Sequence, residues 1–219
     1  ARRVSLYRAT GFPMRWERVS DLITGFHCVD GTLHHHQGHW YLFANVAEGG
    51  GSSCDELFLF VAEAMDGPYR PHPANPIVAD VRCARPAGRL FEHDGRLVRP
   101  GQDCGPDYGA AVVFNEILEL DPLRYAEQPL GRLEPLASAG MTGCHTYSAT
   151  AATEVLDAHG RLPRHWPRLS VEDAGIDTHT PTGCTPRLSV VLAAGNDAAA
   201  ASETAASVLG QSCLDLELI

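Results

Sequence analysis

The sequence lacks several features that mark common classes of protein. Its seven cysteines form no Cys-x-x-Cys pair, no apolar run approaches the length of a membrane span, and 17 Lys and Arg stand against 27 Asp and Glu. The wide cysteine spacing disfavours both a zinc ribbon and a disulfide framework. A net charge of −10 argues against binding to nucleic-acid phosphates. We therefore expect no nucleic-acid partner, no transmembrane segment and free thiols in a cytoplasmic, reducing compartment, with peripheral membrane attachment left open.

What the sequence does contain is a 219-residue chain of ordinary composition, 44% hydrophobic and 20% charged. That length suffices for one large or two small domains. The chain starts at Ala1, and its last residues, DLELI, resemble a strand interrupted in mid-course. We expect a fragment of a longer protein.

Three landmarks recur in the same order in the first 160 residues: an aromatic residue at a turn, a cysteine that leads a short strand, and a polar turn with glycine before a strand. They stand at Trp16, Tyr69 and Tyr125, at Cys28, Cys83 and Cys144, and in HQGHWYLF, EHDGRLVRP and DAHGRLP. A period of roughly fifty residues with short strands is typical of β-propeller blades, which bury both faces by stacking. The pattern predicts an incomplete propeller over residues 1–160, with a β-sandwich as the alternative.

The strands led by cysteine are expected to be the innermost strand of each blade, with the three cysteines buried and unpaired. Alternate side chains of a strand share a face, so Asp30 and Arg85 should lie on the same face as the cysteine two residues earlier. His145 directly follows its cysteine and would face the other way unless a bulge shifts it. Polar residues at these positions are candidates for binding a ligand.

Two long segments carry a resemblance to a known family. RWERVSDLITGFHCVDGTLHHHQGHWYLFANV and the region containing ARPAG, RPGQDCGPDYG and NEILEL resemble the N-terminal domain of plant glucosamine inositolphosphorylceramide transferases, over residues 4–160. Bacterial multidomain proteins carry similar domains. The resemblance implies a relation to the five-bladed propellers of glycoside hydrolase family 43.

In those hydrolases an inner-strand Asp precedes a hairpin similar to HQGHWYLF, so the resemblance implies that Asp30 occupies an assisting carboxylate position. The matching strand of the next unit offers Arg85 in place of a second acid. Because a glycosidase needs two carboxylates at the scissile bond, hydrolysis stays an alternative that rests on Asp30 alone.

The segment RPGQDCGPDYG is expected to form a polar loop from Arg99 to Tyr108, able to bond sugar hydroxyls and to stack a sugar on the tyrosine ring. The alternative is a turn whose side chains cap their own backbone. The predicted carbohydrate-binding residues are Asp30, Arg85, Gln102, Asp103, Tyr108 and His145.

Two other segments invite a functional interpretation that we do not adopt. In LHHHQGHW, His34 and His36 share a strand face and His39 lies beyond the turn, but no further ligand is apparent, so we predict a solvated edge and no metal site. The segment EGGGSSCDE precedes a strand and not a helix, which makes it a hairpin loop and not a phosphate cradle.

The last third of the chain changes character. Prolines interrupt the pattern after residue 157, and we assign residues 161–186 to a linker. RLSVVLAAGN then predicts a buried parallel strand, AAAASETAASVLGQ a helix and DLELI a second strand, which together open a doubly wound α/β sheet. AAGNDAAA has a single glycine, which excludes a dinucleotide-binding fingerprint.

Within residues 187–219, the pieces SVVLAAGN, SVLGQS and DLELI resemble the start of glycosyltransferase family 2. The resemblance implies a GT-A-like domain that uses a nucleotide-diphosphate sugar, a glycan or lipid acceptor, and Mg²⁺ or Mn²⁺ whose ligands lie beyond Ile219. Ala193 and Gly195 depart from the usual Pro and Tyr. The residues implied to line the nucleotide-sugar site are Ala193, Ala194, Gly195, Asn196 and Glu203, with a solvated helix face as the alternative for Glu203.

The predicted fold class is therefore mainly β: a partial five-bladed propeller followed by the first βαβ unit of a doubly wound domain. The leading functional hypothesis is a fragment of a multidomain glycosyltransferase, in which no residue of this chain is catalytic for transfer. A carbohydrate-binding propeller without catalysis and a propeller hydrolase are the alternatives.

Overall fold

A computed structural model describes most of the first 160 residues and two short pieces beyond them. The described ranges are 2–11, 14–49, 51–135, 141–150 and 154–160, with the backbone of 188–190 and 216–218. The chain divides into two compact units, residues 1–149 with 156–161, and residues 150–155 with 162–219. Every regular element in these ranges is a β-strand, and none of the described segments is a helix that could cross a membrane.

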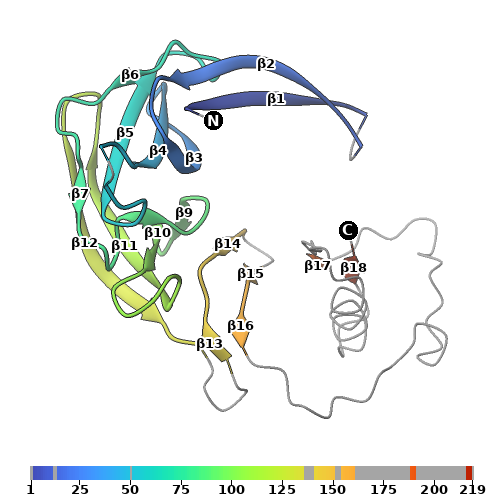
Figure 1. The fold of residues 1–219 in the computed structure, drawn as a ribbon, viewed down its shortest axis with the longest axis vertical. Helices are drawn as coiled ribbons and strands as arrows, with labels where there is room; N and C mark the ends of the chain where they lie inside the picture. The colour runs from blue at the N-terminus through green and yellow to red at the C-terminus, as the bar shows by residue number, and fades with distance from the viewer. Residues whose placement is uncertain are drawn as a thin grey trace. The chain divides into compact units, whose positions relative to one another are not determined.

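The first unit begins with a long hairpin and a sheet that follows it along the chain (Figure 1). The hairpin strands are β1 (Arg3–Gly11) and β2 (Arg15–Thr24). The sheet has the order β3-β4-β5-β6, with a short strand β7 also on β5. Its strands are β3 (Cys28–His36), β4 (His39–Val46), β5 (Glu56–Ala62), β6 (Arg70–Pro71) and β7 (Val78–Ala79). All neighbours pair antiparallel, so the sheet is a meander.

A second meander repeats this arrangement. Its order is β8-β10-β11-β12, with β9 also on β10, and all pairs are antiparallel. The strands are β8 (Arg85–Pro86), β9 (Phe91–His93), β10 (Arg96–Asp103), β11 (Ala111–Leu120) and β12 (Tyr125–Leu133). Each sheet thus has four strands in its main order and one further short strand, and two successive antiparallel meanders of this kind are typical of propeller blades.

The remaining strands are short. They are β13 (Met141–Gly143), β14 (Tyr147–Ala149), β15 (Glu154–Leu156), β16 (His159–Gly160), β17 (Leu188–Val190) and β18 (Leu216–Leu218). β13 pairs antiparallel with β16 in the first unit. β17 and β18 pair in parallel in the second unit, as the strands of a βαβ unit would, while the expected helix between them lies outside the described residues.

The repeated landmarks occupy equivalent places in the two meanders. Tyr69 immediately precedes β6 and Tyr125 begins β12, each the last strand of its sheet. Gln37–Gly38 and Asp94–Gly95 form the tight turns that lead into β4 and β10, and all four residues have positive φ. Such two-residue turns match the twist of antiparallel strands. Two of the three landmarks of the repeat therefore mark equivalent places in the two sheets.

Three apolar clusters show how the sheets pack. The first joins Tyr41 and Phe43 of β4 to Ile117 and Leu120 of β11. The second joins Leu42, the intervening residue on β4, to the β1–β2 hairpin. Because neighbouring side chains of β4 point to opposite faces, both faces of this sheet are covered and the strand is buried along most of its length.

A third cluster continues the stacking beyond the second meander. It joins Ala87 and Val112 to Cys144 and Tyr147, which belong to the segment around β13 and β14. Each sheet is thus covered by the sheet before it and by the segment after it, and the prediction of a mainly β, propeller-type fold is confirmed.

The expectation for the cysteines needs correction. All five cysteines in the described residues are free, as predicted, and Cys144 is buried, but Cys28 and Cys83 are only half-buried. Only Cys28 begins a strand: Cys83 lies in a turn before β8, and Cys144 follows β13. The strands nearest Cys83 and Cys144 are short: β8 has two residues and β13 has three.

Candidate functional site

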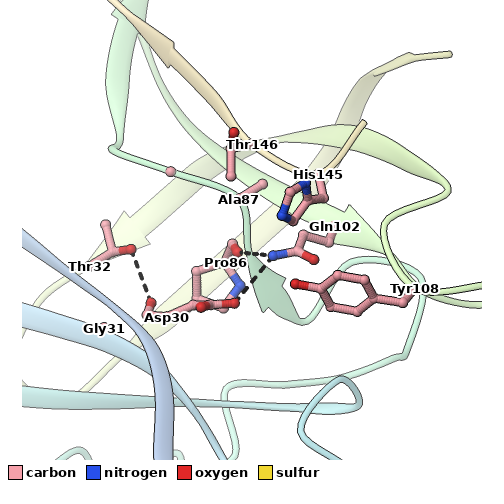
Figure 2. Close-up of a pocket in the computed structure, with 10 residues that line it drawn as sticks. Asp30, Gly31, Thr32, Pro86, Ala87, Gln102, Tyr108, His145 and Thr146 are labelled. Atoms are coloured by element: carbon pink, nitrogen blue, oxygen red, sulfur yellow. Dashed lines mark hydrogen bonds between the residues drawn. The ribbon is translucent and has the colours of Figure 1, made fainter. Parts of the chain in front are cut away.

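One pocket of about 240 Å³ lies where the first strands of the two meanders approach the segment after β13. It is lined by Asp30, Gly31, Thr32, Pro86, Ala87, Gly88, Gln102, Tyr108, His145 and Thr146. In Figure 2 the polar side chains of Asp30, Gln102, Tyr108 and His145 are directed toward a common space. The structure thus brings together four of the six residues predicted to bind carbohydrate.

A bulge in β3 places Asp30 at this pocket. The register between β3 and β4 shifts between Val29 and Thr32, and Asp30 has a φ of 53°. Left-handed backbone is uncommon for residues other than glycine, although aspartate tolerates it better than most, and it costs on the order of 1 kcal/mol. Bulges of this kind re-aim a side chain. Simple strand alternation, which we used to place Asp30, is therefore not what positions it.

The Asp30 carboxylate accepts hydrogen bonds from two side chains. Its Oδ2 accepts a hydrogen bond from Arg85 Nε at 2.6 Å and another from Gln102 Nε2 at 3.2 Å. Gln102 Nε2 also donates to Pro86 O at 2.8 Å, and this amide is almost fully buried. The second carboxylate oxygen of Asp30 has no partner among the described residues and remains available to a ligand.

Arg85 lies behind the pocket and does not line it. Its side chain is only 11% exposed, and it contacts Asp30, the Ser53 hydroxyl and the Cys54 thiol. Its guanidinium carbon lies 4.9 Å from the centroid of the Tyr108 ring, a cation–π distance. Burial opposes its charge, but the contacts with Cys54 and Asp30 outweigh burial and raise the pKa of Arg85. Arg85 therefore acts as a fixed support for Asp30 and Tyr108.

Tyr108 provides the exposed face of the pocket. The residue is 54% exposed, and its ring lies 5.5 Å from that of His145 between centroids. Burial raises the pKa of its hydroxyl, so the phenol stays protonated near neutral pH. Gly109 adopts a φ of 64° and sits so close to His145 that any side chain at this position would clash with it. A glycine is therefore needed for the tyrosine loop to approach the histidine.

His145 is oriented by a residue that sequence reasoning missed. Its Nδ1 lies in contact with Asp157 Oδ2, and Asp157 Oδ1 accepts the backbone N–H groups of His145 at 2.9 Å and Thr146 at 2.6 Å. Burial alone would raise the pKa of Asp157, but these backbone hydrogen bonds lower it below its ordinary value. Asp157 is the first residue of DAHGRLP, the third polar turn of the repeat, but that pattern did not identify it as a site residue.

Two of the predicted polar residues belong to the interior of the sheet and not to a loop. β10 continues through Asp103, so the segment from Arg99 to Asp103 is strand and the loop begins only afterwards. Arg99 is buried and paired with Glu127. The Asp103 carboxylate accepts Gly105 N–H and pairs with Arg132, and it does not reach the pocket. The prediction of a polar loop starting at Arg99 was wrong because antiparallel pairing with β11 extends further than the Pro and Gly suggested.

The histidine-rich strand also differs from expectation. His34 and His36 share a face, with ring centroids 6.0 Å apart, but His34 is half-buried and not solvated. Burial, helped by the neighbouring His36, lowers the pKa of His34 to about 4. In the part of the chain that the structure describes, no group of three or more His, Cys, Asp or Glu is arranged to hold a metal ion.

The residues implied to bind a nucleotide sugar lie outside the described residues. They are Ala193, Ala194, Gly195, Asn196 and Glu203.

Residues 1–137 match the sequence model of a family described as "Glucosamine inositolphosphorylceramide transferase 1, N-terminal". The chain is 35% identical over 128 residues to glucosamine inositolphosphorylceramide transferase 1 of Arabidopsis thaliana, covering 57% of this chain and 17% of that protein. It is 36% identical over 132 residues to the protein of the same name from Oryza sativa subsp. japonica, covering 59% and 18%. The chain thus spans less than a fifth of the length of these relatives.

Two solved structures are distantly similar. One is Bacteroides ovatus Xyloglucan PUL GH43B, with a TM-score of 0.45, 13% identity and coverage of 70% of this chain and 30% of that one. The other is CoXyl43, a GH43 β-xylosidase/α-arabinofuranosidase from a compost microbial metagenome, with a TM-score of 0.31, 16% identity and coverage of 49% and 36%. Likeness at this level says nothing about what the present chain does.

Proposed function

The chain belongs to the family of the N-terminal domain of glucosamine inositolphosphorylceramide transferase 1, and from this premise we propose that it is the sugar-facing part of a larger glycosyltransferase. In this proposal the pocket beside Asp30 binds a sugar or cyclitol group of a substrate and does not cleave it. The names of the relatives support this choice, because glucosamine and inositol are both hydroxyl-rich rings.

One observation carries the preference for binding over hydrolysis. Asp30 is the only carboxylate among the described residues that line the pocket, and its Oδ2 is occupied by Arg85 and Gln102. Glycosidases place a second carboxyl group across the scissile bond as acid, base or nucleophile. A single, clamped carboxylate beside an exposed tyrosine ring suits recognition of a sugar better than its cleavage.

The transfer step is assigned to sequence outside this pocket. We propose that residues 187–219 open a domain that takes a nucleotide-diphosphate sugar, with Mg²⁺ or Mn²⁺ held by residues that follow Ile219 in the parent protein. The parallel pairing of β17 with β18 supports this opening. When bound, the metal would neutralise the leaving diphosphate. The acceptor would be a glycan or a lipid headgroup, and the free thiols support a cytoplasmic location with the membrane surface within reach.

Titration of the 219-residue chain with glucosamine, myo-inositol and methyl glucoside tests the pocket, with ligand-observed NMR as the readout. We expect saturable binding that Tyr108→Ala weakens about tenfold, because losing a ring face of on the order of 60 Å² removes about 1.5 kcal/mol of apolar contact. Tyr7→Ala is the matched control: Tyr7 is 53% exposed, on β1, and does not line the pocket. It should leave binding unchanged.

The same samples separate the alternatives. If the chain releases sugar from an aryl glycoside and Asp30→Asn stops the release, the pocket is hydrolytic and our proposal is wrong. If the unmodified 219-residue chain and Tyr108→Ala bind sugar equally well, any sugar site lies elsewhere.

A further inference from the structure

His145 in the pocket is in contact with Asp157, and the hydrogen bonds of Asp157 fix the position of its carboxylate. Asp157 uses one oxygen, Oδ1, for three hydrogen bonds that build the turn: the two backbone N–H groups of His145 and Thr146 and the Thr146 hydroxyl at 3.0 Å. Its other oxygen, Oδ2, contacts His145 Nδ1. The carboxylate is thus anchored independently of the ring that it contacts.

This anchoring determines which nitrogen of the neutral ring carries the proton. A carboxylate oxygen only accepts hydrogen bonds, so Nδ1 must be the protonated nitrogen. The Nε2 atom then carries a lone pair, and the described residues provide it with no hydrogen-bond donor. In Figure 2 the His145 ring points from its segment toward the side chain of Gln102, and both residues line the pocket. The pocket therefore presents an acceptor at Nε2.

Other atoms of the pocket add to this acceptor character. Asp30 Oδ1 is free, because both of the side-chain donors that reach this carboxylate use Oδ2. The NH₂ group of Gln102 donates to Asp30 Oδ2 and to Pro86 O. The Gln102 side-chain oxygen accepts only a long contact of 3.9 Å from the Cys104 thiol. The Tyr108 hydroxyl is approached by Arg85 Nη2 at 3.5 Å, which leaves its own proton to donate. Acceptors outnumber donors at the open surface.

We propose that His145 is the specificity-determining residue of this pocket, with Asp157 as its positioning residue. The pocket then selects a polyol that presents two hydroxyl donors at once, one to His145 Nε2 and one to Asp30 Oδ1. This inference rests on the proposed function and adds which ligand groups are recognised. Replacing a recognised hydroxyl by an O-methyl group removes the donor, so the pocket rejects such a ligand.

The substitution Asp157→Asn tests the positioning role with little change in shape. The asparagine oxygen can keep the backbone hydrogen bonds of the turn, while its NH₂ group replaces Oδ2 and donates to His145 Nδ1. The proton must then move to Nε2, which turns an acceptor into a donor. Asp121→Asn is the matched control, because Asp121 also accepts two backbone N–H groups, from Leu123 and Arg124, and does not line the pocket.

Two measurements on the full 219-residue chain are needed. Imidazole ¹⁵N chemical shifts of the ligand-free protein report the tautomer, and NMR titration with myo-inositol, methyl glucoside and its O-methyl ethers reports recognition. We expect the Nδ1–H form in the parent chain and in Asp121→Asn, and the Nε2–H form in Asp157→Asn. Polyol binding should fall at least tenfold in Asp157→Asn and in His145→Ala, and at least one O-methyl ether should bind tenfold more weakly than methyl glucoside.

The outcomes distinguish this inference from the function on which it rests. If the parent binds a polyol but shows the Nε2–H tautomer, or if Asp157→Asn binds as tightly as the parent, the inference fails and the sugar-binding proposal stands. If the tautomers are as expected but no polyol binds the parent chain, both proposals fall.

Discussion

At the scale of single residues, the interior of the second meander depends on one buried ion pair. Arg99 donates from Nε and Nη2 to the two carboxylate oxygens of Glu127, both at 2.7 Å, and from Nη2 to Cys83 O at 3.0 Å. The Tyr125 hydroxyl donates to the same carboxylate. The Arg99 side chain is 1% exposed, so its charge has no water as a substitute partner, while the Glu127 side chain is 11% exposed. Such a pair is costly to break from one side.

We predict that Glu127→Gln destabilises the protein by about 3–5 kcal/mol, because it leaves the Arg99 charge buried without a counter-charge. Urea unfolding followed by circular dichroism would measure this. Glu119→Gln removes a carboxylate whose partner, Arg124, is 70% exposed, and it should have a several-fold smaller effect. The double variant Arg99→Met with Glu127→Leu should recover much of the loss. Equal stabilities for Glu127→Gln and Glu119→Gln would contradict the prediction.

The thiols allow a second prediction at this scale. Burial raises the pKa of Cys28, Cys83 and Cys104 to about 11. Since the thiolate is the reactive form and a raised pKa keeps the thiol protonated, these cysteines should alkylate slowly at pH 8 and faster as the pH approaches 11. Mass spectrometry of the native protein after brief iodoacetamide treatment would locate the label, with urea-unfolded protein as the control. Rapid labelling of all three at pH 8 would show that the sheets do not pack as described.

At the scale of elements, the second meander is joined to its first strand through a glycine. Gly101 on β10 pairs with Pro86 on β8, and a Cβ at this position would lie well inside the contact distance of Cys83 O and against Arg99. This close approach keeps β8 paired with β10. Gln102 on β10 can then donate hydrogen bonds both to Pro86 O on β8 and to the Asp30 carboxylate. The pocket geometry thus depends on a backbone contact that only glycine permits.

We predict that Gly101→Ala destabilises the protein by about 1–3 kcal/mol, since the added methyl group forces β8 away from β10. Gly131→Ala is the matched control on β12, because nothing lies within 4 Å of a Cβ there. It should be neutral or stabilising by up to about 1 kcal/mol through the unfolded chain. Thermal unfolding measures the stability of the two variants. If neither substitution changes the stability, the contact between β8 and β10 is looser than the structure shows.

At the scale of the whole molecule, the chain corresponds to only a small part of its plant relatives. It belongs to the family over residues 1–137 and covers less than a fifth of its plant relatives. The pocket beside Asp30 is built entirely within the first compact unit. Binding and transfer are therefore expected to be separable activities.

We predict that this chain alone transfers no sugar and binds no nucleotide-diphosphate sugar in the presence of Mn²⁺. A doubly wound sheet assembles its donor site from several strand ends, and losing metal stabilisation of the leaving group alone lowers the rate by orders of magnitude. Calorimetric titration with uridine and guanosine diphosphate sugars plus manganese should show no saturable heat, while the polyol titration described above serves as the positive control. Micromolar, metal-dependent binding by this chain would contradict the division of roles.

The sequence alone determined the features that depend on short stretches of chain. The blade repeat was predictable because turn residues such as Gly38 and Gly95, and aromatic residues such as Tyr69 and Tyr125, act locally on strand ends. The family resemblance was also predictable, since it rests on contiguous motifs. The nucleotide-sugar residues and the domain boundaries stay predictions.

The tertiary structure decided which side chains meet. Asp30 and Gln102 are 72 residues apart, and they touch because a bulge in β3 and the β8–β10 contact bring two sheets together. Asp103 lies outside the site because β10 continues further than its Pro and Gly suggested. Asp157, the first residue of the DAHGRLP turn, reaches the site through its hydrogen bonds to the backbone of His145 and Thr146. A strand's period of two says which face a side chain takes, but bulges and sheet stacking set the final direction, and these depend on packing between segments distant in the chain.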